Sequence, residues 1–181
     1  DKPKVELIDK NYINQLLQNY TLSVTHLSHY LDCPLRFYFQ CLIRVPSGKS
    51  PSATFGSAAH DALKRAFRTL KENGDEFPPT ELFIKDFRTY MFRNRDSFTK
   101  DEFKLRLDYG EKILPPYYEL NTLSWNKIAL VELSIKNIEV EGVPVKGSLD
   151  KVEFTGKQVT VVDYKTLKLP KAKEKVQRPT N

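Results

Sequence analysis

The 181-residue sequence contains little cysteine and no long apolar run, and each shortage excludes a class of protein. Two cysteines, Cys33 and Cys41, are too few for a disulfide framework, which favours an intracellular protein. The longest apolar candidates, around residues 128–131, have the length of a strand and not that of a membrane span. No secretory signal is recognisable, and the chain starts with aspartate instead of methionine. We therefore expect an intracellular protein without a membrane partner, excised from a longer chain.

Several nucleotide-binding and helicase signatures are missing as well. Residues 46–52 contain Gly-Lys-Ser, but the first glycine of a phosphate-binding P-loop is absent. We interpret this proline- and serine-rich stretch as a loop. No helicase motif and no internal repeat is found.

The composition that is present favours a folded globule with a basic surface. Hydrophobic residues make up 40% and aromatic residues 12% of the chain, which exceeds what disordered chains contain. Lysine and arginine (29) outnumber aspartate and glutamate (23), so the formal net charge is +6. Such a balance suits a polyanionic partner such as DNA. The C-terminal residues that we predict to contact DNA backbone are Lys168, Lys171, Lys173, Lys175 and Arg178.

A second basic and aromatic stretch, residues 85–95, has two interpretations. Its exposed side chains could contact nucleic acid, or the stretch could be an ordinary solvated helix. For Phe83, Phe87 and Met91 the helical spacing favours a place in the core.

The first two thirds of the chain have the pattern of helices. Ser23 is suited to cap a helix that runs to about Leu31, and Leu35–Leu42 continues as helix after Cys33-Pro34. The clearest helix follows, because the apolar residues between 59 and 70 recur with helical spacing. His60 lies at the edge of that apolar stripe. Further helices are predicted over 80–95 and 100–120, the second broken or kinked by two prolines.

Residues 143–166 have the pattern of a β-hairpin that collects charged residues. Strands at 143–154 and 159–166 follow a strand at 129–135, and we predict a two-residue turn at Thr155-Gly156. That turn places Asp150 opposite Val161, diagonal to Asp163 and on its face. Diagonal neighbours lie about 7–8 Å apart, so two carboxylates could share one cation.

The residue types at this hairpin suit metal-assisted hydrolysis. Carboxylate oxygens are preferred ligands of Mg²⁺ and Mn²⁺. Asp163 and Lys165 share a strand face, so the lysine could orient a water or stabilise a developing oxyanion. The alternative is a half-exposed hairpin with ordinary surface charges, because an Asp-x-Lys triplet alone is common.

Three segments in order resemble the PD-(D/E)xK nuclease superfamily, specifically its RecB/AddB-like branch. Residues 22–39 are similar to the opening motif of that branch, S-x-x-x-L-x-x-Y-x-x-C-P-x-x-F. Residues 55–60, Phe-Gly-Ser-Ala-Ala-His, are similar to its F-G-x-x-x-H helix start. Residues 147–166 are similar to its two catalytic strands, although Leu149 stands where the superfamily name has proline. The resemblance implies an α/β, restriction-endonuclease-like core with a largely antiparallel or mixed central sheet flanked by helices, after an N-terminal helical part.

The resemblance also implies a set of roles. His60, Asp150 and Asp163 would ligate Mg²⁺ or Mn²⁺ together with the backbone carbonyl of Tyr164, and Lys165 would activate or position the water. Glu132 matches a glutamate that would support the site from behind the ligands, or else it is a surface glutamate. Some relatives hold an iron–sulfur cluster with four cysteines. With only Cys33 at such a position, this chain alone holds no cluster, and Cys33 is expected to be buried.

The function implied is a metal-dependent DNA nuclease, an exonuclease of DNA repair and recombination in the bacterial cytoplasm. Its partners would be DNA and a helicase domain or subunit. The alternatives are an inactive DNA-binding module and a subunit-interaction module of a helicase complex. We expect one nuclease domain over 1–181, helical at 22–125, with the sheet at 126–168 and a basic tail at 169–181. The Gln-x-x-x-Tyr helix that follows in this branch is missing, so the isolated piece is expected to be a fragment that could lack activity.

Overall fold

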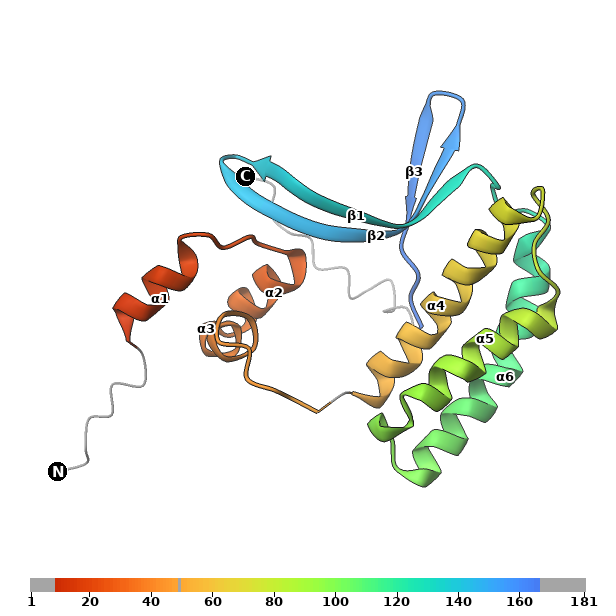
Figure 1. Ribbon diagram of the computed structural model, residues 1–181, viewed down its shortest axis with the longest axis horizontal. Helices are drawn as coiled ribbons and strands as arrows, with labels where there is room; N and C mark the ends of the chain where they lie inside the picture. The colour runs from red at the N-terminus through yellow and green to blue at the C-terminus, as the bar shows by residue number, and fades with distance from the viewer. Residues whose placement is uncertain (1–8, 49, 167–181) are drawn as a thin grey trace, which may run out of the picture. The chain divides into compact units, whose positions relative to one another are not determined.

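The computed structural model describes residues 9–48 and 50–166, in which helices precede a sheet (Figure 1). The helical elements are α1 (Lys10–Leu17), α2 (Val24–Asp32), α3 (Pro34–Phe37), the π-helix η1 (Tyr38–Leu42), α4 (Pro51–Glu72), α5 (Thr80–Arg93), the 3₁₀ helix η2 (Arg95–Ser97) and α6 (Lys100–Thr122). The strands are β1 (Ala129–Val140), β2 (Val143–Thr155) and β3 (Gln158–Val162). The expected α/β class is confirmed. Among the described residues, no helix has the length and apolar character needed to cross a membrane.

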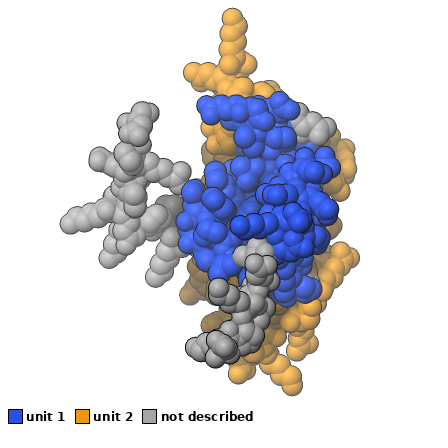
Figure 2. Space-filling model, turned by 90° about the vertical axis from the view of Figure 1, so that its left-hand side faces the viewer, with its two compact units in different colours: residues 1–47, 133–149 blue, residues 48–132, 150–181 orange. Residues whose placement is uncertain are grey.

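The chain divides into two compact units, which Figure 2 shows in different colours. One contains residues 1–47 and 133–149, and the other contains residues 48–132 and 150–181. Strands β1 and β2 each contribute residues to both units. The prediction of one nuclease domain over the whole chain stays a prediction.

Helix α4 carries His60, and local sequence sets where this helix begins. The Ser50 side chain accepts a backbone hydrogen bond from the first turn, and Pro51 occupies a position where no N–H is needed. The helix therefore begins inside the segment 46–52 that we predicted as a loop. The apolar stripe that faces the core is buried, as predicted: it comprises Phe55, Ala58, Ala59, Ala62, Leu63, Ala66, Phe67 and Leu70.

Helices α5 and α6 lie beside α4 and complete the core of this unit (Figure 1). Phe83, Phe87 and Met91 of α5 are buried in it, which confirms their predicted place. Gly110 of α6 allows a close helix contact, because a Cβ there would overlap the Phe87 ring. The Tyr118 ring of α6 stacks on Phe83 with ring centroids 4.2 Å apart.

Helix α6 continues through Pro115-Pro116, where we predicted a break or kink, and ends at Thr122. A capping box of Thr99 and Glu102 starts the helix. Leu114 and Tyr118 are buried on either side of the prolines. The helix is therefore continuous at the prolines, and it lacks the backbone hydrogen bonds that the prolines cannot donate.

In the other unit, Ser23 caps α2 as predicted, with its Oγ accepting the His26 amide at 3.2 Å. The predicted helix 35–42 forms as the short helix α3 followed by the π-helix η1. Cys33, which we expected to be buried, is exposed, whereas Cys41 is buried. Cys33 is exposed because the helix is interrupted at Cys33-Pro34. Cys33 caps the end of α2 in an extended conformation and does not pack inside a helix.

The three strands form one sheet in the order β1-β2-β3. β2 and β3 are antiparallel, and Thr155 pairs with Gln158, so the turn is Gly156-Lys157. The predicted turn at Thr155-Gly156 is wrong by one residue, because Gly156, with φ +59°, takes the first turn position. The turn length is still two residues. Lys151 therefore faces Val162, and the ladder ends there, before Asp163.

Candidate metal centre

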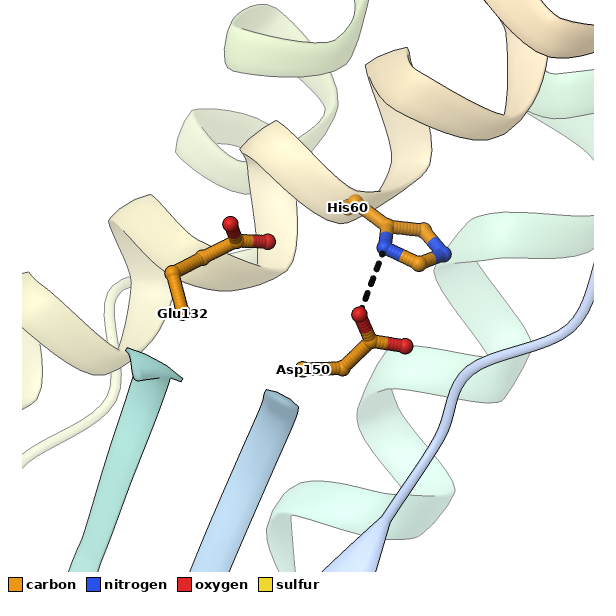
Figure 3. Close-up of side chains that lie close together, drawn as sticks. All are labelled: His60, Glu132 and Asp150. Carbon is orange, nitrogen blue, oxygen red and sulfur yellow. Dashed lines mark ion pairs between the residues drawn. The ribbon is translucent and has the colours of Figure 1, made fainter. Parts of the chain in front are cut away.

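His60 stands midway along α4 and reaches one group of β2 and one of the segment after β3. Its Nδ1 lies 3.5 Å from Oδ1 of Asp150 (Figure 3). Its Nε2 lies 3.1 Å from the carbonyl oxygen of Tyr164. A carbonyl oxygen can only accept, so Nε2 carries the hydrogen in that contact. In the neutral imidazole, Nδ1 then has a free lone pair directed at the Asp150 carboxylate. This tautomer suits a metal ligand whose other nitrogen is held in place.

Asp150 joins the histidine to the segment that follows β3. Its Oδ2 accepts the backbone N–H of Tyr164 at 2.7 Å, while its Oδ1 faces His60. Only 16% of the Asp150 side chain is exposed. One oxygen of the Asp150 carboxylate therefore lies against His60, and the other holds the backbone that leads to Lys165.

Glu132 of β1 extends toward the same region as His60 and Asp150 (Figure 3). One ligand atom from each of these three residues lies within 4.8 Å of the others. Glu132 has φ +53°, a left-handed conformation that costs a non-glycine residue about 1–3 kcal/mol and persists only where the surroundings enforce it. Such an outlier at a charged cluster indicates a functional position.

Asp163 and Lys165 follow the end of β3 and form an exposed ion pair. Lys165 Nζ lies 2.7 Å from Oδ2 and 2.9 Å from Oδ1 of Asp163. This hydrogen bond from Lys165 lowers the pKa of Asp163, and smaller effects of Asp150 and His60 act in the same direction. Asp163 is thus close to the cluster, although it is not among the three residues whose ligand atoms converge. The same hydrogen bond raises the pKa of Lys165, so the lysine is an ammonium ion at neutral pH.

The donor set fits a divalent cation of the Mg²⁺ or Mn²⁺ type. Two carboxylates and one imidazole converge, and the Asp163 carboxylate lies nearby. Oxygen-rich sites suit Mg²⁺ and Mn²⁺, and an imidazole ligand shifts the preference toward the later metals of the first row. The arrangement is therefore a candidate metal centre with an ammonium group beside it.

Sequence reasoning missed Lys151, which contacts the Tyr164 ring of the segment after β3. Its side chain is 1% exposed, and Nζ pairs with Glu153 at 2.6 Å. The ammonium group also lies over the rings of Phe67, Trp125 and Tyr164, at 4.9, 5.1 and 5.9 Å from their centroids. The alternation of strand residues does place Lys151 and Glu153 on one face, which was the available signal. Nothing local indicated that this face would be buried among aromatic rings.

The predicted DNA contacts at Lys168, Lys171, Lys173, Lys175 and Arg178 lie outside the described residues.

We expect Tyr164→Phe to leave the free energy of unfolding unchanged or to raise it by about 1 kcal/mol. Burial raises the pKa of Tyr164, and its buried hydroxyl has no hydrogen-bond partner among the described residues. The backbone groups that hold Asp150 and His60 are untouched by the change. Urea denaturation measures the effect.

Tyr118→Phe is the matched control, because that buried hydroxyl donates to the Pro78 carbonyl at 2.7 Å. Its loss should lower the free energy of unfolding by about 1 kcal/mol. An equal destabilisation by Tyr164→Phe would show that the Tyr164 hydroxyl is satisfied after all.

Helices followed by a β-hairpin, with a histidine and carboxylates converging beside it, define an α/β protein with a candidate metal centre. The family model of the PD-(D/E)XK nuclease superfamily matches residues 21–180, and the chain belongs to this superfamily. Its fold is accordingly the expected restriction-endonuclease-like one.

A curated relative supports the RecB/AddB-like branch. The chain is 32% identical over 115 residues to a protein of Carboxydothermus hydrogenoformans that is named as a subunit of an ATP-dependent helicase/deoxyribonuclease. The aligned part covers 60% of this chain and 10% of that relative. No solved structure matches the chain significantly.

Proposed function

We propose that this chain is a divalent-metal-dependent deoxyribonuclease domain that hydrolyses phosphodiester bonds. The observation that carries the proposal is the convergence of His60, Glu132 and Asp150 in a member of a nuclease superfamily. The name of the relative, which describes a helicase/deoxyribonuclease, supports DNA as the substrate.

As the motifs imply, His60, Asp150 and Asp163 would hold Mg²⁺ or Mn²⁺. The Tyr164 carbonyl, which the motifs also imply as a ligand, lies at the opposite nitrogen of His60 and would hold the imidazole ring instead. Glu132 lies close enough to His60 and Asp150 to be a further donor and not only a support. A bound divalent ion lowers the pKa of a water and stabilises negative charge on phosphorus-bound oxygens.

The residues of the chain prepare this site in three ways. Asp150 holds the Tyr164 amide, which fixes the backbone that leads into Lys165. The carbonyl of Tyr164 orients the imidazole of His60. Lys165 would activate or position the attacking water, or stabilise charge on the phosphate oxygens.

We extend the proposal to exonuclease action in DNA repair and recombination, in the bacterial cytoplasm and beside a helicase domain or subunit. The relative's name supports the helicase partner. The competing function, an inactive DNA-binding or subunit-interaction module, gives the opposite outcome in the experiment that follows.

The test is cleavage of a labelled oligonucleotide by the full chain with Mg²⁺ or Mn²⁺, and with a chelator in their place. We expect products only when a divalent ion is present. Without a cation between them, the carboxylates of the site repel the negatively charged phosphate. A 3′-labelled and a 5′-labelled strand distinguish stepwise from internal cleavage. Binding without cleavage under every metal condition would favour the inactive module.

A further inference from the structure

A cavity of about 390 Å³ opens beside the candidate metal centre, within the same unit. His60, Tyr164 and Lys165 are among the residues that line it. Its volume is in the range of about 300–1,000 Å³ that is typical of small-molecule pockets. The cavity therefore shares residues with the metal centre but extends well past it.

Two helix stripes form the walls of this cavity. Phe55, Ala59 and Leu63 come from α4, and Tyr109, Ile113 and Tyr117 come from α6. Within each stripe the residues are four apart, so they lie on one helix face. The small side chain of Ala59 leaves room between the larger ones.

Two of the aromatic residues that line this cavity are partly exposed to solvent. Tyr109 is 47% and Tyr117 is 38% exposed. The Arg106 guanidinium lies over the Phe55 ring, 6.0 Å from its centroid, and donates a hydrogen bond to Ser52. The cavity thus offers flat apolar faces with a cation nearby, together with Lys165 and His60.

A nucleotide likewise combines a flat, apolar base with a charged phosphate. Aromatic side chains bind unpaired bases by stacking, and this contact contributes about 1–3 kcal/mol per base without sequence preference. A base in a duplex is already stacked on both faces, so only an unpaired or extruded base can enter such a pocket.

We propose that this cavity binds one unpaired nucleobase of the strand whose phosphate occupies the metal centre, with Tyr109 and Tyr117 as its stacking surfaces. The inference rests on the proposed nuclease function and adds a base-binding pocket to it. The pocket would set how the strand lies across His60 and Lys165. The other conceivable occupant is the chain's own segment after Thr166, which the experiment separates from DNA.

The experiment measures the affinity of the full chain for a labelled single-stranded oligonucleotide with Ca²⁺, a divalent ion that also prefers oxygen ligands, in place of Mg²⁺ or Mn²⁺. Tyr109→Ala should weaken binding about 5-fold or more, whereas Tyr109→Phe, which keeps the ring, should bind as the wild type does. Tyr12→Ala is the matched control, because Tyr12 is as exposed as Tyr109 (46% against 47%) and does not line the cavity. Tyr117→Ala replaces Tyr109→Ala if the latter fails to fold.

Oligonucleotides with a single abasic position, moved along the strand, then locate the base. When the abasic position falls at the pocket, the wild type should lose as much affinity as the Tyr109→Ala variant loses on the intact strand. The Tyr109→Ala variant should lose no further affinity on that abasic strand. A variant that binds every strand as the wild type does overturns the pocket. If Tyr109→Ala binds DNA as the wild type does but unfolds at a lower midpoint, the pocket proposal fails and the segment after Thr166 is the better occupant.

Cleavage assays with Mn²⁺ on the same strands separate this inference from the proposed function. If the wild type shows the base dependence but never cleaves, the nuclease function fails and the pocket stands. If the wild type cleaves and Tyr109→Ala keeps full affinity, only the pocket fails.

Discussion

Replacing Lys165 with alanine is expected to slow DNA cleavage by about 100- to 1,000-fold while the fold and the metal affinity are retained. The side chain is exposed and its contact is the ion pair with Asp163, so its loss removes little packing. Removing an ammonium group beside carboxylates also removes a charge that repels a metal ion. The affinity for Mn²⁺ should therefore be unchanged or higher, whereas it would fall if the role of Lys165 were to hold the metal ligands in place.

Two further variants sharpen this prediction. Lys157→Ala, in the turn of the same hairpin, removes an exposed lysine away from the cluster and should cleave at the wild-type rate. Lys165→Arg keeps the charge but changes the donor geometry, and should recover only part of the rate. Wild-type cleavage by Lys165→Ala would place the catalytic group elsewhere.

Asp150→Asn is expected to weaken Mn²⁺ binding more than about 100-fold and to reduce cleavage below detection. Substitutions that only support a metal ligand cost about 10- to 100-fold in affinity, and the loss of a charged ligand should exceed this range. Asparagine retains an oxygen that can accept the Tyr164 amide, so the chain after β3 keeps its anchor. Calorimetric titration with Mn²⁺ and a cleavage assay together measure the effect.

The same titration separates the contributions of the two other carboxylates. If Glu132 is a direct donor, Glu132→Gln should lower Mn²⁺ affinity by about 10-fold or more. Asp163→Asn should lower the affinity and also release Lys165. Asp108→Asn, on α6 and away from the cluster, is the matched control. Wild-type Mn²⁺ affinity in Asp150→Asn would contradict the metal centre.

Much of the helical part could be predicted, because local interactions decide it. The Ser23 cap and the apolar spacing between residues 59 and 70 act within one or two helix turns, and both predictions are confirmed. The same spacing places His60 at the edge of the buried stripe, and in the folded chain it contacts the Tyr164 carbonyl there. The start of α4 at Pro51 was missed, because the serine and proline there suit both a loop and a helix cap.

The hairpin was predicted less well, because a turn is decided by one or two residues. Gly156 can take the left-handed conformation at either turn position, so the sequence permitted both registers. In the observed register the ladder ends at Val162. Asp163 and Lys165 therefore meet in the segment beyond the strand and not by strand alternation.

The sequence by itself determined the chemistry of this protein: the family, the helices, and a histidine, aspartates and a lysine within three ordered segments. Only the tertiary structure turned Glu132 toward His60, buried Lys151 among three rings and left a cavity between Tyr109 and Ala59. Caps and periodicity act between residues a few positions apart, and so they can be read along the chain. A left-handed backbone inside a strand, a buried cation and an open space between helices each depend on residues from distant segments, whose contacts form only when the chain folds.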